Sequence, residues 1–248
     1  SNMKKYIVHA LFSLCILLVS SCLDGREEFW FERNGSGRIE AEYHLPVFAV
    51  ASMGGEEKLQ KTIEDFFAKE EGVTLDHFSL VFKDAAAVMT IKARFDSVVD
   101  LTKLFEKSPT PGAPTMPDPM MKLLGEVEVK RDGMSVTLHR KIDARQVFGG
   151  GLLAPSRDQL KGHSLQYIVH LPTKASSTNA QEIQDGGRTL RWNYSLIQAM
   201  ESPVETNFTT PIPIPWWAWL AVIVLLTMAV LGLKWLLKKR RVTNQADG

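Results

Sequence analysis

One cysteine near the start of the chain lies in a sequence that directs chemical modification of that cysteine. Cys22 follows Val19-Ser20-Ser21, at the end of the apolar stretch from Tyr6 to Val19, which Lys4 and Lys5 precede. A basic start, a short apolar stretch and small residues before a cleavage point are typical of an export signal. An aliphatic residue and two small residues before a cysteine indicate a bacterial lipoprotein signal. We therefore expect residues 1–22 to be the lipoprotein signal segment, with cleavage before Cys22 and diacylglycerol on its thiol.

The sequence contains no spacing that matches a catalytic or metal-binding motif. HExxH, paired cysteines and the Gly-x-Ser-x-Gly turn are all absent. His44, His139 and His170 fall on the polar phase of alternating segments, where solvated side chains are the expected interpretation. The methionines of residues 108–125 lack the His or Cys companions of a copper site. We therefore expect no enzymatic activity, no metal and no cofactor.

Two segments combine apolar side chains with residues that interrupt regular structure. Residues 108–125 are rich in Pro and Met, and residues 147–155 contain three consecutive glycines. Apolar side chains on such segments are unfavourable unless they contact something, so they either cap the core or form the rim of a lipid-sized pocket. Methionine suits the second role because its side chain adapts to irregular partners. The candidate rim residues are Met120, Met121, Leu124, Phe148, Leu152 and Leu153.

The C-terminal part of the chain predicts a single membrane-spanning helix. Trp216 to Leu233 has no charged residue, and as a helix it would be about 27 Å long, close to one hydrocarbon core. The predicted helix covers residues 216–237, and the basic tail of residues 238–248 should remain cytoplasmic. The Pro-rich linker of residues 211–215 is short, as is the chain after Cys22. We therefore expect both ends of the intervening domain to lie near one membrane leaflet.

The region between the two membrane signals has the composition of one folded domain. Residues 23–233 carry 22 basic and 27 acidic side chains, a net charge of −5 that disfavours binding to nucleic acid. Cys22 is the sole cysteine left after processing, so packing must hold the domain without an internal disulfide. We expect residues 27–210 to form one monomeric exported domain.

Alternating apolar residues predict a sheet built from hairpins. The first hairpin runs from Phe29 to Leu45 around Asn34-Gly35, and the second from Phe78 to Phe95. A third joins residues 123–129 to 134–138, and a fourth pairs 165–171 with 190–194. One face of the sheet should be apolar and the other polar.

Helical spacing of apolar residues appears twice between these strands. Leu59, Ile63, Phe66 and Phe67 form one stripe within residues 56–71, and a shorter helix is expected over residues 97–107 with Asp96 as its cap. The predicted fold class is α+β, with a curved, mostly antiparallel sheet backed by one or two helices.

The last third of this domain resembles a known family. Tyr167 to Pro172, Ser177-Thr178-Asn179-Ala180 and Asp185 to Trp192 resemble the LppM-domain family of bacterial membrane-anchored lipoproteins, and the likeness covers roughly residues 27–200. The resemblance implies a non-enzymatic envelope domain that binds lipids or glycolipids. From the residues alone, Asn179 is expected to form a turn and Trp192 to lie in the core.

These patterns favour an exported, membrane-anchored lipoprotein domain that binds lipids or glycolipids at the cell envelope. The alternative is a structural or assembly partner of other envelope proteins, and a hydrolase is the weakest hypothesis. The expected location is the bacterial cytoplasmic membrane, with the domain facing the periplasm or the cell exterior and the C-terminus in the cytoplasm.

The lipid anchor is directly testable. Cells fed radiolabelled palmitate should incorporate it into the wild-type chain and not into Cys22→Ser, because the thiol carries the lipid. A reporter fused after Gly248 should be active only if it is of a kind that works in the cytoplasm. Palmitate retained by the variant, or periplasmic activity of the reporter, would contradict this topology.

Overall fold

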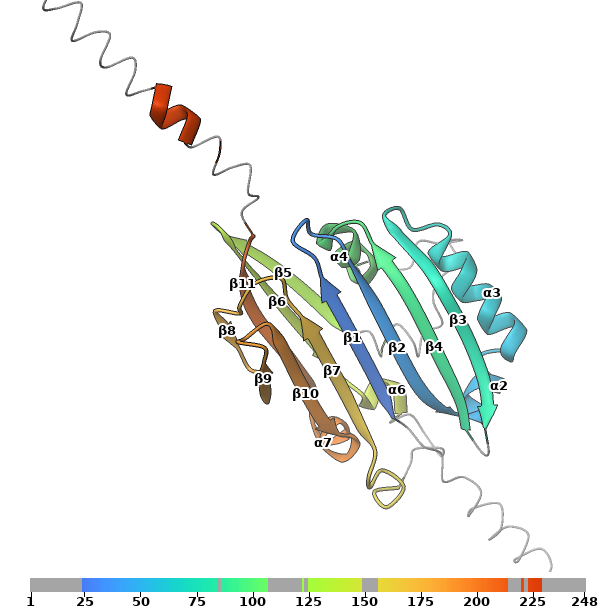
Figure 1. Ribbon diagram of the computed structural model, residues 1–248. Coiled ribbons are helices and arrows are strands. Elements are labelled where there is room, and N and C mark those ends of the chain that lie inside the picture. The colour runs from blue at the N-terminus through green and yellow to red at the C-terminus, as the bar shows by residue number, and fades with distance from the viewer. Residues whose placement is uncertain are drawn as a thin grey trace, which may run out of the picture. The chain divides into compact units, whose positions relative to one another are not determined.

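A computed structural model of the protein describes residues 24–83, 86–106, 125–148 and 156–213, together with 122, 220 and 223–228. The chain separates into two units, residues 1–212 and 213–248. The first unit contains an α+β domain with mostly antiparallel sheets and few helices (Figure 1), which confirms the predicted fold class.

The larger sheet contains seven of the described strands, in the order β3-β4-β2-β1-β7-β10-β9. The predicted hairpins are present, since β1 pairs with β2, β3 with β4, and β7 with β10, all antiparallel. Gly35 in the first turn has a φ of 89°, which glycine adopts without strain. The strands are β1 (Gly25–Phe31), β2 (Gly37–Pro46), β3 (Val73–Lys83), β4 (Ala86–Phe95), β7 (Ser164–His170), β9 (Glu182–Gln184) and β10 (Thr189–Ser195).

A second, four-stranded sheet has the order β5-β6-β11-β8, with β5 (Glu126–Asp132), β6 (Ser135–Ile142), β8 (Ser177–Thr178) and β11 (Val204–Pro211). The expectation of one sheet was therefore wrong. The third hairpin, β5 and β6, pairs with β11, which the sequence pattern did not reveal. The apolar face of the large sheet extends beyond the area that the helices cover, and the second sheet packs against the remainder.

Short helices complete the described part of the domain. They are α2 (Val47–Ser52), α3 (Glu56–Phe67), α4 (Val98–Glu106), α6 (Arg145–Phe148) and α7 (Leu196–Glu201). The two predicted helices correspond to α3 and α4. The cap of α4 differs from the prediction. The Asp100 N–H donates to the Ser97 hydroxyl at 3.2 Å, so the side chain that caps α4 is that of Ser97 and not that of Asp96.

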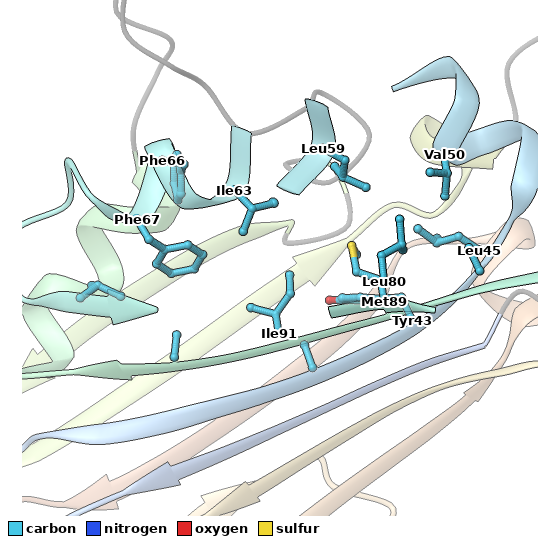
Figure 2. Packing of buried hydrophobic residues seen from close by; sticks show 14 of the residues in the cluster. Tyr43, Leu45, Val50, Leu59, Ile63, Phe66, Phe67, Leu80, Met89 and Ile91 are labelled. Carbon is cyan, nitrogen blue, oxygen red and sulfur yellow. The ribbon is translucent and has the colours of Figure 1, made fainter. Parts of the chain in front are cut away.

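Two hydrophobic clusters lie on the inner face of the large sheet. In the first, Leu59 and Ile63 of α3 are completely buried and point at the strands (Figure 2). Figure 2 also shows Phe66 and Phe67 on the same side of α3, above Met89 and Ile91 of the sheet. The predicted stripe of α3 is thus confirmed residue by residue. The second cluster lies between β1, β7 and β10 of the large sheet and β6 and β11 of the small one.

The domain begins and ends at opposite ends of its strands. Gly25 starts β1 at the end that carries α2, α6 and α7, whereas β11 leaves at the other end (Figure 1). The Ile212 N–H there donates to the Met134 carbonyl in the β5–β6 turn at 2.8 Å. The domain alone therefore does not bring its two ends together. The expectation that both ends lie near one membrane leaflet stays a prediction.

Within the residues that the structure describes, no helix has the length and apolar character needed to cross a membrane. Most of the predicted span lies outside those residues, although residues 223–228 are helical. The spanning helix stays a prediction.

The role of α3 can be tested by truncating its buried side. Leu59→Ala should lower the free energy of unfolding of residues 24–212 by about 2–5 kcal/mol, because it removes a fully buried side chain. Gln60→Ala, on the exposed side of the same helix, should change it by less than about 0.5 kcal/mol. Chemical denaturation followed by circular dichroism gives both values, and equal losses would contradict the packing of α3.

Candidate functional site

The described residues form an apolar hollow between the two sheets. A water-sized molecule can occupy about 30 Å³ of it, and the wider volume of about 470 Å³ also counts gaps between atoms and open solvent. β1, β7 and β10 supply one wall, β5, β6 and β11 supply the other, and Leu101 of α4 lies at the side. The lining residues are Phe29, Phe31, Leu101, Val127, Leu138, Arg140, Tyr167, Val169, Trp192, Thr206 and Phe208.

Aromatic rings form much of the lining. The ring of Phe208 on β11 lies 6.4 Å from that of Phe31 on β1 and 6.4 Å from that of Trp192 on β10, measured between centroids. These tilted rings join the two sheets by edge and face contacts. Charged or hydroxyl-bearing aliphatic side chains are few, namely Arg140 and Thr206. A surface of this kind favours hydrocarbon over polar ligands.

A buried ion pair lies beside the hollow and links the sheets. The guanidinium of Arg140 on β6 donates to the Glu27 carboxylate on β1 through Nη1 at 2.5 Å and through Nη2 at 3.0 Å. Glu27 and Arg140 are 2% and 4% exposed, so neither charge is solvated by bulk water. The Tyr43 hydroxyl donates to the same carboxylate, and the guanidinium lies 5.0 Å from the centroid of the Tyr167 ring.

Electrostatics around the pair keep Arg140 charged and the hydroxyls of Tyr43 and Tyr167 protonated. Burial opposes the charged form of Arg140, but the attraction and hydrogen bonds of Glu27 outweigh this and raise the pKa of Arg140 above its ordinary value. Burial, followed by the Glu27 charge, raises the pKa of Tyr43 well above its ordinary range. The pKa of Tyr167 is raised for the same two reasons. Tyr43 therefore remains a donor to Glu27, and Arg140 remains a cation.

Asn179 fixes the tryptophan of the hollow. Its side-chain oxygen accepts from the Trp192 indole N–H and from the Asn207 backbone N–H, each at 2.8 Å. Its amide nitrogen donates to the Glu205 carbonyl at 2.9 Å. Trp192 is 1% exposed, which confirms its predicted place in the core. Asn179 bonds to β11 and not to its own turn, so its role is to join β10 to the small sheet.

The candidate rim residues lie outside the described residues. This holds for Met120, Met121, Leu124, Leu152 and Leu153 and for the side chain of Phe148, whose backbone ends α6. The ends of the two segments are nevertheless described. Glu126 pairs with Lys141, so the chain that follows residue 124 and the chain that leads to residue 148 meet at one end of the small sheet. Val127, which follows at once on β5, lines the hollow. Cys22 also lies outside the described part.

The three histidines on polar strand positions do not cluster. His44 contacts Glu42 at 3.1 Å, His139 contacts Glu205 at 3.4 Å, and His170 contacts Glu28 at 2.7 Å. Among the described residues, no group of three or more His, Cys, Asp or Glu side chains could hold a metal ion.

Comparisons with known proteins give a distant likeness among solved structures. No family model matches the chain, and no curated protein matches it. Among solved structures, the chain is similar to the NMR structure of the folded domain of LppM from Mycobacterium tuberculosis, at 13% sequence identity and a TM-score of 0.48. The match covers 79% of this chain and 92% of that one. The likeness is too distant to assign a function, and membership in the LppM-domain family stays a prediction.

The ion pair can be tested by removing one or both of its charges. Arg140→Met should destabilise residues 24–212 by about 3–5 kcal/mol, because the Glu27 carboxylate would remain buried without its partner. The double variant Glu27→Met with Arg140→Met should recover most of that loss. Denaturant titrations of the three proteins measure the effect, and a double variant no more stable than the single one would argue against the pairing.

Proposed function

We propose that the domain is a non-enzymatic lipid-binding module of the cell envelope, and that the hollow between the two sheets receives a hydrocarbon chain of a lipid or glycolipid. The observation that carries this proposal is the lining of the hollow, in which aromatic and aliphatic side chains from both sheets surround a single ion pair. The exported, doubly anchored arrangement predicted from the sequence would hold such a site beside its ligand.

The ion pair limits what part of a lipid the hollow accepts. Arg140 is already matched by the two oxygens of Glu27, and the Tyr43 hydroxyl occupies the same carboxylate. An ionic headgroup placed against this pair would have to compete with contacts that are already made in a low-dielectric setting. An acyl chain makes no such demand. The acyl chain of the lipid therefore belongs in the hollow, and its headgroup belongs at the mouth of the hollow.

Entry of an acyl chain requires the mouth of the hollow to open further. Leu101 on α4 and Val127 on β5 both line the hollow, and α4 and β5 contact each other. Residues 107–124 connect these two elements in the sequence. Met120, Met121 and Leu124 belong to this connection, which is why they remain the proposed rim.

A bulky residue at the mouth tests the proposal. Val127→Trp should weaken binding of a fluorescent C16 fatty acid at least roughly tenfold, because the indole would occupy the space of the ligand. Val129→Trp is the matched control, since Val129 lies on the same face of β5 and is also half-buried but does not line the hollow.

Both variants should keep the melting temperature of the wild type within a few degrees, measured by circular dichroism. Equal binding by wild type, Val127→Trp and Val129→Trp would remove the hollow as the site. Absence of binding by the wild type would remove the lipid proposal itself and favour an envelope protein as the partner.

A further inference from the structure

Four large apolar side chains are exposed at one end of the large sheet. Val47 and Phe48 at the start of α2 are 40% and 46% exposed, and Val81 and Phe82 near the end of β3 are 57% and 46% exposed. Scattered apolar residues are common on protein surfaces, but contiguous ones mark contact with a partner or a membrane. These four residues are called the end patch below.

The strand register brings the backbones of the two halves of the end patch to one end of the sheet, where the successive residues Val81 and Phe82 point to opposite faces. Pro46 and Lys83 both pair with Ala86, so the last residues of β2 and β3 flank the first residue of β4. Two strand spacings separate them, which is about 10 Å. Since α2 begins directly after Pro46, it starts at this end of the sheet, where it contacts β2 and β4.

The chain leaves the domain toward Cys22 at this same end. The Asp24 carbonyl accepts from the His44 N–H at 2.8 Å, and Gly25 pairs with Tyr43, so the start of β1 lies next to the end of β2. Leu23 alone stands between Asp24 and Cys22, which limits the separation of their Cα atoms to about 7 Å. A lipid on Cys22 would therefore hold the end patch at the membrane surface.

Charges around the end patch are of both signs. Lys83 follows Phe82 and is exposed, while Glu56 and Glu57 begin α3 just after α2. Attraction to anionic lipids is thus weak at best. Burial of the four apolar side chains in the headgroup layer would supply the contact, and such contact is insensitive to salt.

We propose that the end patch docks on the bilayer, with Phe48 and Val81 immersed in the headgroup layer. The proposal rests on the predicted lipid anchor at Cys22 and not on the hollow. α6 lies at the same end as the end patch (Figure 1), so the segment that follows Phe148 also starts there. Pro211 lies at the far end, about 23 Å along β11 from Val204.

Spin labels on the full chain in lipid nanodiscs test the docking. In a Cys15→Ser background, labels are placed singly at Phe48→Cys, at Val81→Cys and, as the control, at Ile183→Cys. Ile183 is 57% exposed, as Val81 is, but it lies on β9 at the opposite edge of the sheet. Power-saturation measurements then compare collisions of each label with oxygen, which concentrates in lipid, and with a water-soluble nickel reagent.

The labels at residues 48 and 81 should favour oxygen, and the label at residue 183 should favour the nickel reagent, at low and at high salt. The same depths are expected when Val127→Trp is added, which separates the docking from binding in the hollow. Labels at 48 and 81 as accessible to nickel as the label at 183 would overturn the proposal. Labels shielded from both reagents would overturn it as well and would indicate a protein, or a second copy of this chain, on the patch.

Discussion

The buried pair of Glu27 and Arg140 is the interaction on which the arrangement of the two sheets depends. It joins β1, in the middle of the large sheet, to β6 in the small one, and both of its charges are shielded from bulk water. A buried charge is tolerated only when its partner has one fixed position. The small sheet therefore cannot slide along the large one by a residue without leaving a carboxylate and a guanidinium unpaired. Hydrophobic contacts alone would permit several packings.

The hollow follows from that fixed position. Side chains of Phe31, Trp192 and Phe208 meet across the interface as tilted ring pairs and line the hollow. Asn179 holds Trp192 by its indole N–H. The polar contacts of the interface thus satisfy one another, and the remaining surface is hydrocarbon. This division is the basis for proposing an acyl chain as the ligand of the site.

Local patterns were enough to predict several elements of the domain. The stripe of α3 and three hairpins are encoded in residues close in sequence, with spacings of 3.6 or 2 residues. The parallel pairing of β1 with β7 and the strand β11 were missed, because no local pattern reports which strands from distant segments become neighbours. Thr206 also interrupts the apolar alternation of β11. For the candidate site, the sequence pointed to the apolar residues of two segments, 108–125 and 147–155, as the rim of a pocket. Glu27 and Arg140 looked like ordinary polar residues, and only their meeting across the two sheets reveals their role.

Photo-crosslinking tests the central claim most directly. The full chain, reconstituted with a phospholipid that carries a diazirine near the end of one acyl chain, would be irradiated, digested and sequenced by mass spectrometry. The account predicts crosslinks in peptides of β1, β6, β10 and β11, at residues such as Phe31, Leu138 and Phe208 that face the hollow. Crosslinks confined to the exposed outer face of the large sheet, or to residues 216–237 alone, would contradict it.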